Sequence, residues 1–177
     1  MASTQDSDSH EQKSTDATLD VVGVGNAIVD ALAHATDGQI AQLGLAKGAM
    51  TLIDADRALE LHDQMEAAIE VSGGSAANTL VGVASLGGRG AYIGKVRDDQ
   101  LGEIFRHDIR AAGVDFRTTA APDSLPTARS LIFVTPDAQR TMQTYLGVSV
   151  ELGPDDIDPE AIGAAQITYL EGYLFDK

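Results

Sequence analysis

Residues 71–80 read VSGGSAANTL and place two glycines, a serine and an asparagine where an apolar helix is expected to begin. Glycine at a helix start lets a ligand approach the backbone closely, and the first N–H groups of a helix have no partner within it. Asn78 follows Gly74 and Ser75 by three or four residues, which places its amide beside the same helix end. An amide there can donate to one oxygen and accept from a neighbour, which suits two adjacent sugar hydroxyls. A Gly-Ser cap with tight packing and a solvated asparagine is the alternative interpretation.

Other stretches that resemble functional motifs lack residues that those motifs require. GVGNAI begins like a dinucleotide-binding fingerprint, but Ile28 stands where the third glycine belongs. GAYIGKV has Val96 in place of the Ser or Thr of a phosphate-binding P-loop, and it has the pattern of a strand. The chain has no cysteine, which excludes disulfides, thiolate metal sites and a cysteine nucleophile. The histidines show no metal-ligand spacing and are expected at the surface: His10, His34, His62 and His107.

The chain of 177 residues has a formal net charge of −15 at pH 7. Nucleic acids and anionic membranes attract clustered Lys and Arg, so this charge argues against both as the main partner. No apolar run approaches the roughly 20 residues of a membrane span, and the N-terminus lacks the basic start and apolar core of a signal peptide. We therefore expect a cytoplasmic protein that is able to bind a small molecule, with a disordered tail over residues 1–18.

The elements that must position the chemical groups alternate between strand and helix along residues 19–177. This rhythm predicts an α/β fold with a Rossmann-like, mainly parallel sheet that is covered by helices on both faces. Strands are expected at 19–24, 48–54, 69–71, 90–96 and 166–174. Helices are expected after Asp54 or Asp56, from Ser75 to Leu86, after Asp98 or Asp99, and around 159–165.

Two segments do not fit the alternating rhythm, at about 31–53 and 127–147. Their strand patterns, with a hairpin turn at 137–139, indicate a second, smaller sheet that projects from the main one.

The stretch GGSAANTLVGVASLGGRGAYIGKVRDDQLG resembles the N-terminal signature of the pfkB, or ribokinase-like, family of sugar and nucleoside kinases. The shared positions follow one another in order and include the glycine pair, Asn78, Leu86, Gly87, Gly94 and Gly102. The resemblance implies that residues 19–177 are the N-terminal part of a ribokinase-like domain, with the projecting sheet as its lid. GNAIVD, LGLAKGAMTLID and YLEGYL are most similar to bacterial adenosine-kinase-like members.

The same resemblance implies substrate-binding roles for residues in two motifs. Asn26 and Asp30 of GNAIVD would hold ribose or sugar hydroxyls, and a carboxylate that accepts from two adjacent hydroxyls discriminates against analogues that lack them. A turn asparagine and a strand-end aspartate are the alternative roles for this pair. The second wall of the site would consist of Gly73, Gly74, Ser75 and Asn78.

Three later residues have implied roles and competing alternatives. Glu171 falls where ribokinase-like members keep an acid that touches the substrate, and burying it at a strand end would be costly unless it is paired. Arg140 resembles an arginine near the transferred phosphate, although a surface arginine on a hairpin fits as well. Tyr173 would flank a base or sugar, or pack in the core. Glu171 departs from the small residue expected in animal adenosine kinases, which leaves adenosine, other nucleosides, ribose and fructose-type sugars open as acceptors.

The implied activity is ATP- and Mg²⁺-dependent transfer of a phosphoryl group to a primary hydroxyl of a nucleoside or sugar. The family's second signature, D-T-x-G-A-G-D, supplies the anion hole for the phosphates and the general-base Asp, and it does not occur in this sequence. We therefore expect the chain to hold the acceptor-binding and lid portion and to be inactive by itself. The alternatives are a non-catalytic nucleoside- or sugar-binding remnant and an interaction module that forms a homodimer through the lid sheet.

Overall fold

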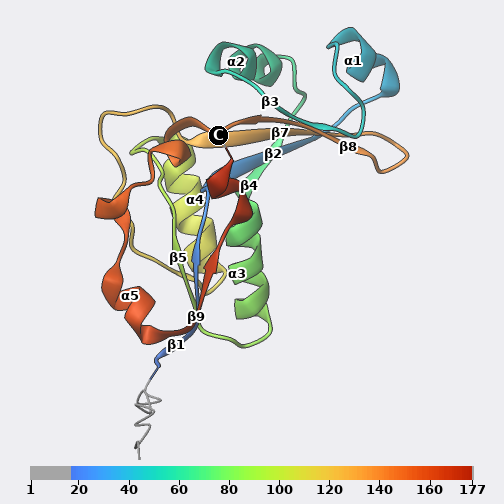
Figure 1. Cartoon of the computed structure of the whole chain (residues 1–177). Helices are drawn as coiled ribbons and strands as arrows, with labels where there is room; N and C mark the ends of the chain where they lie inside the picture. The colour runs from blue at the N-terminus through green and yellow to red at the C-terminus, as the bar shows by residue number, and fades with distance from the viewer. Residues whose placement is uncertain (1–16, 177) are drawn as a thin grey trace, which may run out of the picture.

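Four parallel strands form the main sheet of the computed structural model, which describes residues 17–176 (Figure 1). Their order across the sheet is β6-β5-β1-β9. Their bounds are β1 Leu19–Val24, β5 Gly90–Ile93, β6 Asp115–Phe116 and β9 Ala165–Leu170. The predicted parallel α/β sheet is confirmed, whereas residues 1–16, most of the predicted disordered tail, lie outside the described residues.

Helices cover both faces of this sheet, as the apolar strands require. They are α3 Ser75–Ser85, α4 Gln100–Ala111 and α5 Pro159–Ala164. On the face of α3 and α4, the rings of Tyr92, Phe105 and Phe116 form a buried cluster with centroids 5.4 to 5.9 Å apart. On the opposite face, Val22 and Val24 pack in a cluster that includes residues of α5.

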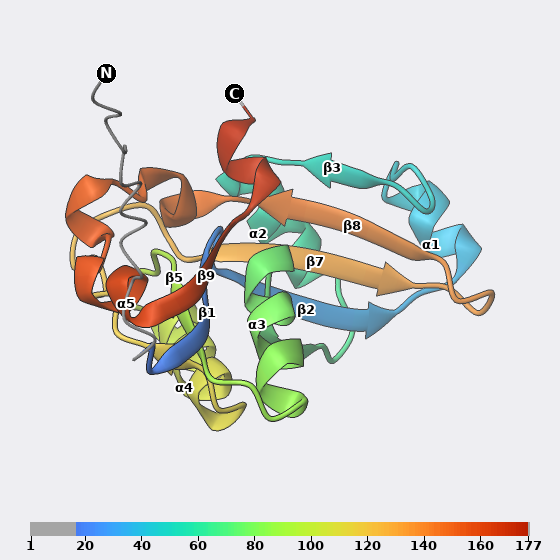
Figure 2. The same ribbon diagram turned by 60° about the horizontal axis from the view of Figure 1, so that its bottom comes forward.

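A second sheet of five strands projects from the first, in the order β3-β8-β7-β2-β4 (Figure 2). Its strands are β2 Ile28–His34, β3 Met50–Leu52, β4 Ile69–Gly73, β7 Ala128–Val134 and β8 Arg140–Tyr145. β2 runs parallel to β7 and antiparallel to β4, so the sheet is mixed. Within the described residues this sheet has more strands than the main one, because β4 joins it and β2 begins before the expected segment at 31–53.

Two helices lie above the second sheet in Figure 1, on the side away from α3: α1 Asp37–Gln42 and α2 Ala55–Asp63. The sequence pattern missed α1, whose start is fixed by a capping box between Thr36 and Gln39. α2 begins after Asp54 and not after Asp56, because the Asp54 carboxylate accepts a hydrogen bond of 2.8 Å from the Arg57 N–H. In the same way, Asp99 caps α4.

The chain crosses between the two sheets at neighbouring points. Gly25, Asn26 and Ala27 connect β1 to β2, and Gly74 connects β4 to α3. This arrangement brings GNAIVD and VSGGSAANTL, which are about 45 residues apart, to one junction.

Beyond Leu170 the chain departs from its predicted course. The expected strand over 166–174 ends there, and residues 172–175 form a 3₁₀ helix, η3 Gly172–Phe175. Two other 3₁₀ helices precede α5, η1 Gly147–Glu151 and η2 Pro154–Asp156. Among the described residues, no helix is both long and apolar enough to cross a membrane.

Candidate functional site

The start of α3 lies against the crossing from β1 to β2, and Gly74 makes this approach possible. Its φ of +96° is a conformation that residues with a Cβ rarely adopt. A Cβ at this position would also lie 2.5 Å from the carbonyl oxygen of Asn26. Gly73 has a different reason, because a Cβ there would lie 2.4 Å from the Asp30 carboxyl. The glycine pair therefore gives Asn26 and Asp30 the space they occupy.

Glu171 connects three segments at the junction. Its Oε2 accepts hydrogen bonds from the Asn26 N–H at 2.5 Å and from the Asn26 Nδ2 at 3.1 Å. Its Oε1 accepts one from the Ser75 hydroxyl at the start of α3. Its own N–H donates to Val24 at the end of β1 at 2.9 Å. The side chain is 2 % exposed, and these donors offset the cost of burying a carboxylate.

Tyr92 lies under the same junction and has a hydroxyl with no hydrogen-bond partner among the described residues. The side chain is buried, and a Cβ at Gly94 would lie 2.8 Å from the hydroxyl. Burial, together with the negative charge of Glu171, raises the pKa of Tyr92 well above its ordinary value. The group is therefore a neutral phenol beside the carboxylate, and no pattern in the sequence indicated it.

Asp30 lies on β2, which pairs directly with β4, and its carboxyl lies beside Gly73. Burial raises the pKa of Asp30 from 3.8 to about 6, and the charge of Arg140 acts in the opposite direction. No donor within residues 17–176 forms a hydrogen bond to this carboxylate. The half-buried Asp30 carboxylate is thus a hydrogen-bond acceptor with unused lone pairs. It follows Asn26, the partner of Glu171, by a few residues along the chain.

The other predicted site residues lie farther from this cluster. Asn78 is exposed in the first turn of α3, and its side chain makes no hydrogen bond within the described part of the chain. Arg140 begins β8 opposite Val134, four residues or about 13 Å of strand beyond the Ser130 that pairs with Asp30. Tyr173 is 60 % exposed on η3, so the core-packing alternative for it is wrong.

An apolar surface next to Asp30 was missed by the sequence reasoning. Directly paired residues in neighbouring strands point to the same face of a sheet. The register therefore places Val71 beside Asp30, and it places the paired Leu32 and Ile69 two residues further along the same face. Val71 is 38 % exposed and Ile69 is 69 % exposed. We call this surface the open face, and its members are Asp30, Leu32, Met50, Leu52, Ile69, Val71, Arg140 and Met142. The alternation in IEV and MTLI was the available signal.

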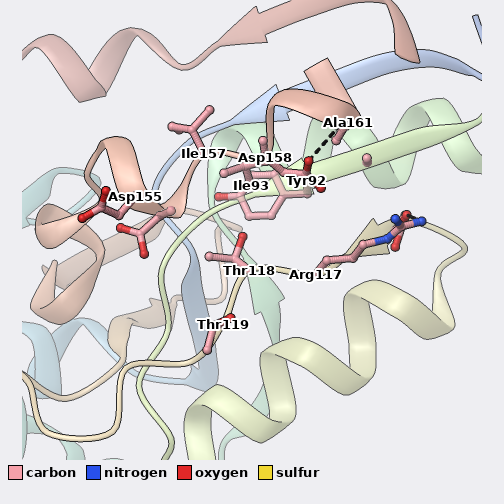
Figure 3. Close-up of a pocket in the computed structure, with 12 residues that line it drawn as sticks. Tyr92, Ile93, Arg117, Thr118, Thr119, Asp155, Ile157, Asp158 and Ala161 are labelled. Atoms are coloured by element: carbon pink, nitrogen blue, oxygen red, sulfur yellow. Dashed lines mark hydrogen bonds and ion pairs between the residues drawn. The ribbon is translucent and has the colours of Figure 1, made fainter. Parts of the chain in front are cut away.

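A cavity of about 200 Å³ lies between β5, β6 and the turn before α5, and Tyr92 is among the residues that line it (Figure 3). It is rich in carboxylates, but three of the four are engaged within the protein: Asp115 pairs with Arg117 at 2.6 Å, Asp156 pairs with Lys95 at 2.8 Å, and Asp158 caps α5. None of the predicted site residues lines it. The described residues also contain no group of three or more His, Asp or Glu side chains suited to a metal ion. The junction therefore remains the candidate site.

Comparison with family models gives one match, which spans residues 39–177. The matching model describes the pfkB family carbohydrate kinases.

Two solved structures have a closely similar fold. The adenosine kinase from Sinorhizobium meliloti is 57 % identical, with a TM-score of 0.84. A probable sugar kinase from Rhizobium etli is 53 % identical, with a TM-score of 0.83. Each alignment covers 89 % of this chain and 48 % of the solved chain.

Among curated proteins, the probable fructokinase-3 of Arabidopsis thaliana is 31 % identical over 101 residues, which cover 56 % of this chain and 29 % of that protein. The chain therefore spans about half the length of the solved relatives, and it corresponds to their N-terminal portion.

Proposed function

Because the chain belongs to the pfkB family of carbohydrate kinases, we propose that it provides the acceptor-binding and lid portion of an ATP-dependent kinase. The complete reaction transfers the γ-phosphoryl group of ATP to a primary hydroxyl of a nucleoside or sugar. The observation that supports this role most directly is the convergence of Asn26, Asp30, Ser75 and Glu171 at one junction between the two sheets.

Within this proposal, Asp30 and Asn26 hold the acceptor's hydroxyls. Asp30 has unused acceptor oxygens, and a carboxylate can accept from two adjacent hydroxyls at once. Asn26 is fixed in place by the two hydrogen bonds that it donates to Glu171. Gly73 and Gly74 leave the space that the Asp30 carboxyl and the Asn26 carbonyl occupy, so that both residues lie beside the start of α3.

The remaining predicted residues complete the proposed site. Glu171 orients Asn26 and Ser75, and its buried oxygens leave little room for a direct ligand contact. Asn78 and Tyr173 are exposed, so a base or sugar is able to reach them. Arg140, on the open face, steadies the phosphoryl group when the second sheet closes over the acceptor.

We favour a nucleoside over a fructose-type sugar as the acceptor. The solved relative with the higher identity is named an adenosine kinase, and the fructokinase of Arabidopsis thaliana is more distant, at 31 % identity. The open face beside Asp30 offers Leu32, Ile69 and Val71, which suit a flat purine ring better than a free hexose.

ATP and Mg²⁺ belong to the proposed complete enzyme and not to the described residues. The D-T-x-G-A-G-D signature is absent from the sequence, and no group of three potential metal-binding side chains is found in residues 17–176. We therefore expect no turnover by this chain alone. ADP formation that depends on adenosine and on the purified 177-residue chain would contradict this part of the proposal.

A second candidate is a binding protein for nucleosides or sugars that takes no part in catalysis, a role that the same cluster of Asn26, Asp30, Ser75 and Glu171 would serve. The two candidates share the acceptor site and differ in whether phosphoryl transfer appears when a nucleotide-binding half is supplied. Binding that persists without any transfer under that condition supports the second candidate.

Calorimetric titration of the chain with adenosine, ribose and fructose tests the acceptor site. We expect adenosine to bind most tightly and Asp30→Asn to weaken its binding at least tenfold, because the charged acceptor of the hydroxyls is lost. Asp63→Asn, at an exposed carboxylate on α2, is the matched control and should leave binding unchanged. Equal affinity of the Asp30→Asn variant and the unchanged chain would contradict the proposed site.

A further inference from the structure

Three neighbouring strands of the main sheet end in a row of two glycines and one carboxylate. β1 is paired in parallel register with β5 and with β9 up to the last residue of each strand. The next residues of β5, β1 and β9 are Gly94, Gly25 and Glu171. The pairing continues there, because the Gly25 N–H donates to β5 at 3.1 Å and the Glu171 N–H donates to β1 at 2.9 Å. The Glu171 side chain therefore lies beside two positions that have no side chain.

The Tyr92 hydroxyl lies about one strand spacing from this carboxylate. Tyr92 precedes Gly94 by two residues, so its ring is on the same face of the sheet. The ring reaches over Gly94, because a Cβ there would lie 2.7 Å from Cε1 of Tyr92 and 2.8 Å from its hydroxyl. Glu171 reaches over Gly25, where a Cβ would lie 2.6 Å from Oε2. Neighbouring strands are about 4.8 Å apart, so the two glycines make room for a hydroxyl and a carboxylate separated by roughly that distance.

The Tyr92 hydroxyl is a costly group to bury without a partner. The side chain is 1 % exposed, and within residues 17–176 no atom forms a hydrogen bond to its hydroxyl. A buried donor without an acceptor is unfavourable. Phenylalanine would fill the same space without that cost, as it does in the adjoining rings of Phe105 and Phe116. A hydroxyl in this place is explained if it gains a partner in another state of the site.

Binding of an acceptor at Asn26 creates such a state. In this structure Glu171 Oε2 accepts from the Asn26 N–H at 2.5 Å and from the Asn26 Nδ2 at 3.1 Å. In the proposed site Asn26 holds a hydroxyl of the acceptor, and an Nδ2 that turns toward this hydroxyl no longer donates to Glu171. The buried carboxylate then has an unused lone pair. The Tyr92 hydroxyl is an unpaired donor at the neighbouring strand position.

We propose that Tyr92 is a positioning residue of the acceptor site, whose hydroxyl donates to the Glu171 carboxylate when an acceptor engages the Asn26 amide. This inference rests on the proposed function, because it requires an acceptor at Asn26. Tyr92 acts through Glu171 and does not touch the acceptor, since its hydroxyl is buried at the junction. The ligands that use it carry a hydroxyl able to accept from Asn26, and the ribose of a nucleoside is of this class.

Tyr92→Phe tests this role because it removes the hydroxyl and retains the ring. Without ligand, the urea midpoint of the variant should equal or exceed that of the unchanged chain, because an unpaired buried group is lost. Adenosine binding measured by calorimetry should weaken about tenfold, because the bound state loses a hydrogen bond to a charged group. Tyr145→Phe is the matched control and should leave binding unchanged, since this half-buried tyrosine lies on the face of β8 away from Asp30. A purely structural hydroxyl would change stability and leave the affinity as it is.

Equal affinity of the Tyr92→Phe variant and the unchanged chain for adenosine overturns the role of Tyr92 and leaves the proposed acceptor site standing. A lower urea midpoint of the ligand-free variant also overturns it, because the hydroxyl would then have a partner before the acceptor binds. The same holds if Tyr145→Phe weakens binding as much as Tyr92→Phe, since the effect would not be specific to the junction. Absence of adenosine binding by the unchanged chain is detected without any variant, and it contradicts the proposed function and the role of Tyr92 together.

Discussion

Glu171 illustrates how a residue with an expected ligand role can serve the site from behind it. The carboxylate is 2 % exposed and accepts from the Asn26 backbone, the Asn26 amide and the Ser75 hydroxyl. A carboxylate with these donors fixes the ends of β1 and β9 relative to the start of α3. Its charge also acts on the nearby Tyr92 hydroxyl, whose pKa it helps to raise.

Replacing Glu171 with Gln should lower the free energy of unfolding by about 1–3 kcal/mol, because an amide NH₂ would face donors and leave buried groups unpaired. Ser75→Ala removes one donor and should cost less, about 1 kcal/mol. Urea denaturation measures both values, with the exposed Glu66→Gln as control. A loss for Glu171→Gln no larger than that of the control would show that the hydrogen bonds do not stabilise the junction.

The ionisation of Asp30 should make stability depend on pH in a defined direction. Its pKa is about 6 in the folded chain against 3.8 as the ordinary value. The folded state therefore binds the proton first as the pH falls, and the free energy of unfolding should rise from pH 7 to pH 4. The contribution of this group is of order 2–3 kcal/mol.

Asp30→Asn should abolish this part of the pH dependence, because the amide does not titrate. Urea midpoints of the variant and the unchanged chain, compared at several values between pH 4 and pH 8, isolate the effect from the other carboxylates. Parallel curves for the two proteins would show that Asp30 is not protonated at a raised pKa.

At the scale of elements, the start of α3 depends on a single backbone conformation. Gly74 has φ +96°, and a Cβ there would meet the Asn26 carbonyl at 2.5 Å. Gly82 lies within the same helix, where a Cβ would meet nothing within 4 Å. Gly74, which immediately precedes α3, therefore excludes a side chain, whereas Gly82, within α3, has room for one.

Gly74→Ala should destabilise the chain by at least about 2 kcal/mol through backbone strain and the clash with Asn26. Gly82→Ala should stabilise it by about 0.5–1 kcal/mol, because alanine restricts the unfolded chain and favours helix. Thermal unfolding followed by circular dichroism should therefore shift in opposite directions. A shift of the same sign for both would contradict the assigned conformation of Gly74.

For the whole molecule, the open face of the second sheet leaves apolar side chains exposed. Met50, Leu52 and Ile69 are 46 %, 59 % and 69 % exposed, respectively. Contiguous apolar surface of this kind favours contact with a ligand or with another protein surface. The interaction proposed from the sequence is a homodimer through the lid sheet, to which this face belongs.

Sedimentation velocity over a concentration series should show association of the unchanged chain that Leu52→Glu and Ile69→Lys each reduce. Leu59→Lys, at a comparably exposed leucine on α2, should leave association unchanged. A chain that stays monomeric at the highest concentration, or association insensitive to both open-face variants, would rule out a dimer through this face.

Much of the architecture was predictable because the responsible signals are local. The apolar run of β1, the caps of α2 and α4 and the glycine start of α3 depend on residues within a few positions of one another. The choice between Asp54 and Asp56 required the structure, since both are suitable capping residues and only the backbone path selects one.

What only the tertiary structure decided is how distant segments meet. Asn26 and Glu171 are 145 positions apart, and Ser75 and Glu171 are 96 apart, so their hydrogen bonds depend on the order in which the strands cross. The membership of β2 and β4 in the second sheet, the apolar surroundings of Asp30 and the end of β9 at Leu170 have the same origin. The sequence by itself determined which residue types could bind hydroxyls and where elements begin. Pairing between strands determined which of these residues share a site, because register is set by long-range contacts and not by local propensity.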